Sequence, residues 1–185
     1  QMCRIMNFLF NAIAVKEFLI FSGCYFLLTA ISIYYTDELV RPAGCAGILS
    51  LELAFTKGAF MDIVNSCGEK GVRSLIILTW IDFLFIIGYI GFLANLLGAL
   101  VKGLERGTAL KLFSIPIIAG VLGVLENSIF LTQLANPEGA SGAAIFLGSA
   151  AAAAKLVLTA ITVLLIVYYL YIAITKKNQA APSQP

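Results

Sequence analysis

The chain has 185 residues, of which 61% are hydrophobic and 12% charged, and its 12 basic and 10 acidic residues give a net charge of +2. Soluble domains carry about 45–50% apolar and about 25% charged residues, so this composition excludes a soluble globular domain, a disordered chain and a nucleic-acid-binding protein. The chain contains no histidine, which removes the commonest metal ligand and the commonest general base. The composition therefore indicates an integral membrane protein.

Four apolar segments are long enough to cross a bilayer, whose hydrocarbon core needs about 20 residues of helix. In chain order they cover residues 12–35, 72–101, 109–135 and 143–175. Turn-forming sequences separate them, such as NPEG at 136–139, and the short later connections predict antiparallel neighbours. The predicted fold is an all-α membrane protein, an antiparallel four-helix transmembrane bundle. Residues 1–175 form one transmembrane domain, and residues 176–185 are expected to be a polar flexible tail.

The connection over residues 36–71 is the only long one, and apolar residues recur in its middle at nearly helical spacing. They are Leu49, Leu53, Phe60 and Val64. With charged residues between them, they predict a short interfacial helix over residues 47–66 in the long outer loop, interrupted at Gly58.

Basic residues divide unevenly between the two sides of this predicted bundle. The side with both termini carries seven Lys and Arg residues near the span ends, and the opposite side carries four. The positive-inside rule then places both termini on the cytoplasmic or equivalent side of a multi-pass protein, with the long connection outside. An outside loop is oxidising in most cells, so Cys45 and Cys67 are expected either to form a disulfide or to remain two free thiols. The chain has no CxxC pair, so we predict no metal or redox site.

Three charged residues lie deep inside predicted spans. Asp82, Glu126 and Lys155 each lie about 10–12 residues from the outer end of a different span, at one depth of about 15–18 Å. A charge at such a depth costs at least about 2.5–3.5 kcal/mol, so these groups are expected to face the bundle interior and pair. Asn127 and Thr159 add polar groups beside them. The sequence therefore predicts an intramembrane polar cluster of Asp82, Glu126, Asn127, Lys155 and Thr159.

The predicted cluster has three interpretations. It can be a structural salt bridge that fixes helix register, a binding site for a lipid or small molecule, or a path for protons or ions. Buried ion pairs are weak evidence for stability, whereas intramembrane ionisable residues indicate function by default. The sequence leaves the three interpretations open.

Small residues line one face of the fourth span. Ala144, Gly148 and Ala152 recur every four residues, a spacing that lets helices pack closely in lipid. This helix-packing face can lie within the bundle or against another protein.

Short motifs resemble those of a family of uncharacterised small bacterial four-span membrane proteins. They are LELAFT at 51–56, DFLF at 82–85 with Tyr89, and Pro116 with LEN at 125–127. Members of that family carry an Asp-x-x-Glu-Asn step in the third span, and here Gly123 occupies its first position. The resemblance implies four spans and a role for Asp82, Glu126 and Asn127, but no activity.

The expected function is that of a non-catalytic integral membrane protein. The sequence contains no Ser/His/Asp or Cys/His arrangement and no phosphate-binding loop, so we predict no catalytic residue, no metal and no cofactor other than a bound lipid. The first hypothesis is an accessory or structural subunit of a larger membrane assembly, with the lipid bilayer and other transmembrane subunits or a second copy as partners. The alternative is a small carrier, or a lipid- or small-molecule-binding protein, that uses the Asp/Glu/Lys cluster.

Overall fold

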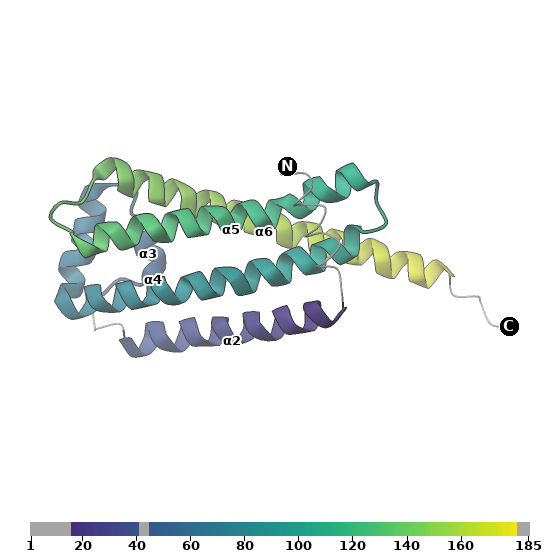
Figure 1. Cartoon of the computed structure of the whole chain (residues 1–185), viewed down its shortest axis with the longest axis horizontal. Coiled ribbons are helices and arrows are strands. Elements are labelled where there is room, and N and C mark those ends of the chain that lie inside the picture. Colours follow the sequence, from purple (N-terminus) through teal and green to yellow (C-terminus); the bar gives the residue numbers. More distant parts are fainter. Residues whose placement is uncertain (1–15, 41–44, 181–185) are drawn as a thin grey trace.

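A computed structural model describes residues 16–40 and 45–180, and these residues form helices without any strand. The helices are α2 (Lys16–Val40), α3 (Ile48–Glu52), α4 (Lys57–Val101), α5 (Arg106–Ala135) and α6 (Gly142–Ala180). Figure 1 shows that α2, α4, α5 and α6 run lengthwise, with α3 near the start of α4. These four helices are long and apolar enough to cross a membrane, so the predicted all-α class and the four long apolar helices are confirmed.

The helix bounds differ from the predicted spans mainly at the ends. The third span, residues 109–135, lies within α5, and the fourth, residues 143–175, lies within α6. Helix α6 continues to Ala180, so residues 176–180 of the predicted tail are helical. Lys, Gln and Ala in this stretch favour helix, and no proline interrupts it before residue 182. Residues 181–185 of the predicted tail and 12–15 of the first predicted span lie outside the described residues.

Helix α4 is longer than the predicted second span because it begins at Lys57. Thr56 caps its start, since the Thr56 side chain accepts a hydrogen bond from the Ala59 amide at 3.2 Å. Gly68 has a φ of 61° inside the helix and divides it into two helical pieces. Only glycine adopts such a backbone conformation readily, so Gly68 lets the chain change direction before the long apolar piece of α4.

The predicted helix over residues 47–66 is interrupted, but at residues 53–56 instead of at Gly58. Helix α3 ends at Glu52, a turn follows, and α4 begins at Lys57, so the interruption precedes Gly58. Within the turn, Phe55 has a φ of 50°, and its amide donates a hydrogen bond to Ser149 Oγ of α6 at 2.9 Å. A contact 94 residues away in the sequence therefore helps to hold the turn, and local periodicity cannot reveal it.

Two apolar cores occupy opposite ends of the packed helices. One joins the starts of α4 and α6 to the end of α5, with Phe60, Phe130 and Ile145 fully enclosed. The other joins the end of α4 to the start of α5, with Leu97 and Phe113 fully enclosed. The deep charged residues lie between these two cores.

The small residues of α6 face α5 within the same chain. A Cβ added at Gly148 would lie 3.2 Å from side-chain atoms of both Ile129 and Phe130, and Ala152 is completely buried. Ala144 is half-buried on the same face. Gly148 and Ala152 of the predicted helix-packing face are thus covered within the chain, whereas Ala144 is partly exposed.

Candidate functional site

Three helices bring the predicted charged residues together at one level. Asp82 comes from α4, Glu126 and Asn127 from α5, and Lys155 from α6. The Lys155 Nζ atom lies 2.8 Å from Glu126 Oε2, and the Asn127 side-chain amide donates a hydrogen bond to Asp82 Oδ2 at 2.9 Å. Glu126 is fully buried, and Asp82 and Lys155 are each 7% exposed. The equal depths inferred from residue counting thus correspond to direct contacts.

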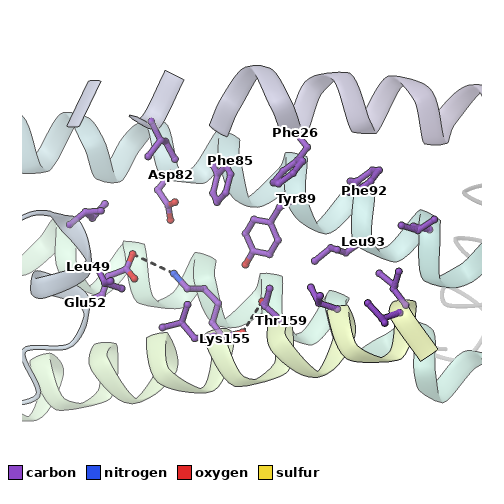
Figure 2. Close-up of a pocket in the computed structure, with 17 residues that line it drawn as sticks. Phe26, Leu49, Glu52, Asp82, Phe85, Tyr89, Phe92, Leu93, Lys155 and Thr159 are labelled. Atoms are coloured by element: carbon purple, nitrogen blue, oxygen red, sulfur yellow. Dashed lines mark hydrogen bonds and ion pairs between the residues drawn. The ribbon is translucent and has the colours of Figure 1, made fainter. Parts of the chain in front are cut away.

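Glu52 is a member of this cluster that the sequence-based prediction missed. Its Oε1 atom lies 3.4 Å from Lys155 Nζ, and its carboxyl group is within hydrogen-bonding reach of Glu126. Figure 2 shows α3 beside the site, with the Glu52 side chain directed at Lys155. A signal was present in the sequence, because Glu52 is the only charged residue between positions 42 and 56.

The charges of the cluster do not balance. Three carboxyl groups, those of Glu52, Asp82 and Glu126, surround the single ammonium group of Lys155. Two carboxylates in hydrogen-bonding reach must share a proton, because an ionised carboxylate only accepts hydrogen bonds. Burial raises the pKa of Glu52 from its ordinary value of 4.5, and the neighbouring Lys155 ammonium opposes that rise. With one proton shared between Glu52 and Glu126, the cluster keeps one net negative charge.

A cavity of about 590 Å³ adjoins the cluster, a size within the usual range of ligand pockets. Its walls come from α2, α3, α4 and α6. The polar groups Glu52, Asp82, Tyr89, Lys155 and Thr159 gather toward one end, where Figure 2 shows their side chains directed inward. The remaining lining residues are Phe26, Ile33, Ile48, Leu49, Phe85, Phe92, Leu93, Leu96, Leu156, Val163, Ile166 and Val167. The cavity is therefore polar at one end and apolar along the rest of its length.

Thr159 and Tyr89 complete the polar end. The Thr159 hydroxyl donates a hydrogen bond to the Lys155 carbonyl oxygen of its own helix at 2.8 Å. The Tyr89 side chain points into the cavity toward Thr159 (Figure 2), and Tyr89 is 7% exposed. Its hydroxyl group is buried and lies within hydrogen-bonding reach of the Thr159 side chain. Tyr89 thus presents a hydroxyl group to whatever occupies the cavity.

Gly123 makes room for the lysine. A Cβ at this position would lie 3.1 Å from Lys155 Cδ and 2.9 Å from Ile86 Cδ1. A side chain at position 123 would therefore crowd the stem of Lys155, and glycine avoids this contact.

Cys45 and Cys67 are joined by a disulfide in the structure. The bond connects the segment before α3 to α4 next to Gly68, so it restrains α3 and the Glu52 side chain that α3 carries. Among the described residues, Cys24 is a free and exposed cysteine, and no group of His, Cys, Asp and Glu side chains could hold a metal ion.

Comparison with family models, with curated proteins and with solved structures finds no match. The resemblance to small bacterial four-span proteins therefore stays a prediction. The function has to be argued from the geometry of the cluster and its cavity.

Proposed function

We propose that this protein binds a single-chain amphiphile inside the membrane. The observation that carries the proposal is the cavity itself, which joins a long apolar channel to the buried carboxylate of Asp82. Along α6 the lining extends from Lys155 to Val167, 12 residues further on, which corresponds to about 18 Å of helix. This shape suits one hydrocarbon chain with a polar head group at the cluster end.

The proposed setting is an antiparallel bundle in which α2, α4, α5 and α6 each cross the bilayer. The distribution of Lys and Arg favours both termini on the cytoplasmic or equivalent side, with α3 and the Cys45–Cys67 disulfide toward the opposite side. A disulfide at that end agrees with an oxidising compartment. In this orientation the polar end of the cavity faces the outer half of the bilayer.

Ligand entry from the bilayer is consistent with the packing of α2. Helix α2 packs along α4 but makes at most slight contact with α6, and both α2 and α6 line the cavity. The side between them is therefore a route by which a lipid-like molecule can enter without crossing the closed α4–α5–α6 core.

The accessory-subunit hypothesis has less support. Its main sequence argument was the small face of α6, and that face packs against Ile129 and Phe130 of α5. A structural role alone also leaves the cavity beside Asp82 without a purpose. We therefore rank ligand binding first and assembly into a larger complex second.

A pair of variants on α4 tests the proposal. Leu93 lines the cavity, so Leu93→Trp is expected to fill it, whereas Leu84 faces outward with 51% exposure and Leu84→Trp serves as the matched control. Each variant is purified in lipid nanodiscs, and native mass spectrometry with lipid extraction measures what remains bound. We expect one amphiphile to copurify with wild type and Leu84→Trp and to be lost from Leu93→Trp. Equal occupancy in all three proteins, or no bound amphiphile in wild type, overturns the proposal.

A further inference from the structure

Among the described residues, Asp82 is the one carboxyl group of the cluster that makes no direct ion pair with Lys155, although the two side chains lie near enough to interact electrostatically. Its Oδ2 atom accepts a hydrogen bond from the Asn127 amide. Among residues 16–40 and 45–180, the ion pairs of Lys155 go instead to Glu52 and Glu126. Asp82 also lines the cavity and points into it (Figure 2). A buried charge is stable only when it is paired and hydrogen-bonded, so the missing partner of Asp82 is expected from the cavity side.

The charges around the cavity also disfavour a ligand with an anionic head group. In the part of the chain that the structure describes, Lys155 is the only cationic residue that lines the cavity, and its ammonium group already contacts two carboxyl groups. A carboxylate or phosphate placed here would meet Asp82 and the shared charge of Glu52 and Glu126 in a poorly solvated site. Like charges repel strongly where water is largely excluded, so an amphiphile with an acidic head group should bind poorly in this cavity.

Tyr89 offers a second polar group at this end of the cavity. Its buried hydroxyl lies within hydrogen-bonding reach of the Thr159 side chain and points into the cavity. A tyrosine hydroxyl that donates its proton to a neighbour can still accept a hydrogen bond, so an ammonium N–H can donate to this oxygen as well as to Asp82. The Phe85 ring packs next to Tyr89, with the ring centroids 5.2 Å apart, and an aromatic face also attracts a nearby cation.

We infer that the bound amphiphile carries a protonated amine as its head group, with Asp82 as the counter-ion and Tyr89 as a second acceptor. This inference rests on the proposed function and names the ligand class of the same cavity. The alkyl chain then lies along Phe92, Leu96 and Val167 in the apolar part.

A head-group series tests this assignment without any mutation. The wild-type protein in phosphatidylcholine nanodiscs is photo-crosslinked to an alkylamine that carries a diazirine on its chain, and the labelled residues are mapped by mass spectrometry. Four unlabelled amphiphiles then compete with this probe, and the loss of labelling is measured against the concentration of each in the nanodiscs. They are dodecylamine, dodecanol, dodecyltrimethylammonium and dodecanoic acid. We expect dodecylamine to compete about 10- to 100-fold better than dodecanol, because a hydrogen bond to a charged group adds that much affinity. Dodecyltrimethylammonium has no N–H donor and should rank below the amine, and dodecanoic acid should be the weakest competitor.

Asp82→Asn then assigns the preference to one residue, with the exposed residue Asp62 providing the matched control Asp62→Asn. The advantage of dodecylamine over dodecanol should disappear in Asp82→Asn and persist in Asp62→Asn. If Asp82→Asn does not fold, Tyr89→Phe replaces it, since this exchange removes only one hydroxyl group and keeps the ring. Tyr89→Phe should weaken competition by dodecylamine by about 2- to 10-fold.

The outcomes separate this inference from the proposed function. If dodecanol or dodecanoic acid competes as well as dodecylamine in wild type, the cavity binds amphiphiles but the amine assignment is overturned. If the amine advantage survives in Asp82→Asn, Asp82 is not the counter-ion. If the probe labels Leu93→Trp as strongly as wild type, the cavity is not the binding site and the proposed function fails with it.

Discussion

Helix α4 has two faces that are packed in opposite ways. Toward α5 the helices approach closely, because a Cβ at Gly120 or Gly123 would collide with an isoleucine side chain of α4. The hollow on this side is the smaller of the two, at about 310 Å³, and we call this side the closed face. Toward α2 the contact includes large rings, such as Phe26 and Phe92, whose centroids lie 5.6 Å apart, and a cavity remains beside them. The closed face is suited to holding charges in fixed pairs, and the open face is suited to admitting a ligand.

The cluster lies on the boundary between these two faces. Glu126 and Asn127 reach it from the closed side, whereas Glu52 and Asp82 border the cavity. Lys155 contacts both sets. Glu126 on the closed side is paired with Lys155 of the same chain. Asp82, which makes no ion pair with Lys155, borders the cavity, where a ligand can reach it.

The largest effect is expected from Lys155→Met, which breaks the link between the two faces. Removing the ammonium leaves the carboxyl groups of Glu52 and Glu126 buried without a cation, and breaking a buried pair costs about 3–5 kcal/mol. Thermal unfolding in nanodiscs should show a large loss of stability, while Lys102→Met at an exposed position should change little. The double variant Lys155→Met/Glu126→Gln should recover part of the loss, and no recovery would argue against the pairing.

The second largest effect on stability is expected from loss of the disulfide. This bond restrains the segment that contains Glu52, a residue that borders the cavity. The cysteines are 22 residues apart, and closing a loop of that size stabilises a fold by about 3 kcal/mol. Cys45→Ala/Cys67→Ala should therefore lower the unfolding temperature, and Cys24→Ala at the exposed cysteine should not. Mass spectrometry with and without reductant checks the bond itself, and four free thiols in the oxidised protein would contradict it.

Gly123→Leu tests the closed face directly. The new side chain would meet Ile86 and the stem of Lys155, and overpacking of this kind costs about 1–3 kcal/mol. On the face toward α2, a Cβ at Gly91 would have only an ordinary contact with Ser22 at 3.8 Å, so Gly91→Ala should be tolerated. Unfolding measurements that rank the two variants in the reverse order would show that α4 is not packed as described.

The smallest effect is a pH dependence at Glu52. Burial raises the pKa of Glu52, so the folded chain holds this proton more tightly than the unfolded chain does. The resulting stabilisation is complete below the ordinary pKa of 4.5 and is lost as the pH rises through the raised value. Glu52→Gln should flatten the dependence of the unfolding temperature on pH in this window, whereas Glu69→Gln at an exposed position should leave it unchanged. The assignment would be contradicted if the unfolding temperature of the wild-type protein rose with pH between 4.5 and the raised pKa, and if this rise were smaller in Glu52→Gln.

Much of the architecture could be predicted because it depends on length and hydropathy. Four long apolar runs gave four long helices, and the depth of Asp82, Glu126 and Lys155 along those runs predicted that they would meet. Helical rise is constant, so counting residues from the span ends is a measurement of depth. The low charge content made these three residues conspicuous.

The turn after α3 and the role of Glu52 could not be predicted in the same way. Hydrophobic periodicity predicted a helix over residues 47–66 interrupted at Gly58, but the chain turns earlier, at residues 53–56, where Ser149 of α6 contacts the turn. That turn directs Glu52 to Lys155, 103 residues further along. Local patterns carry no information about such contacts.

The sequence by itself determined that the chain is an all-helical protein with four helices able to span a membrane, and that a few charges lie deep within them. These properties follow from composition and from the fixed geometry of a helix. Only the tertiary structure decided which charges pair, because pairing depends on helix rotation and on close approach at residues such as Gly123. It also decided that α2 stays apart from α6 beside Asp82, and that separation creates the cavity on which the proposed function rests.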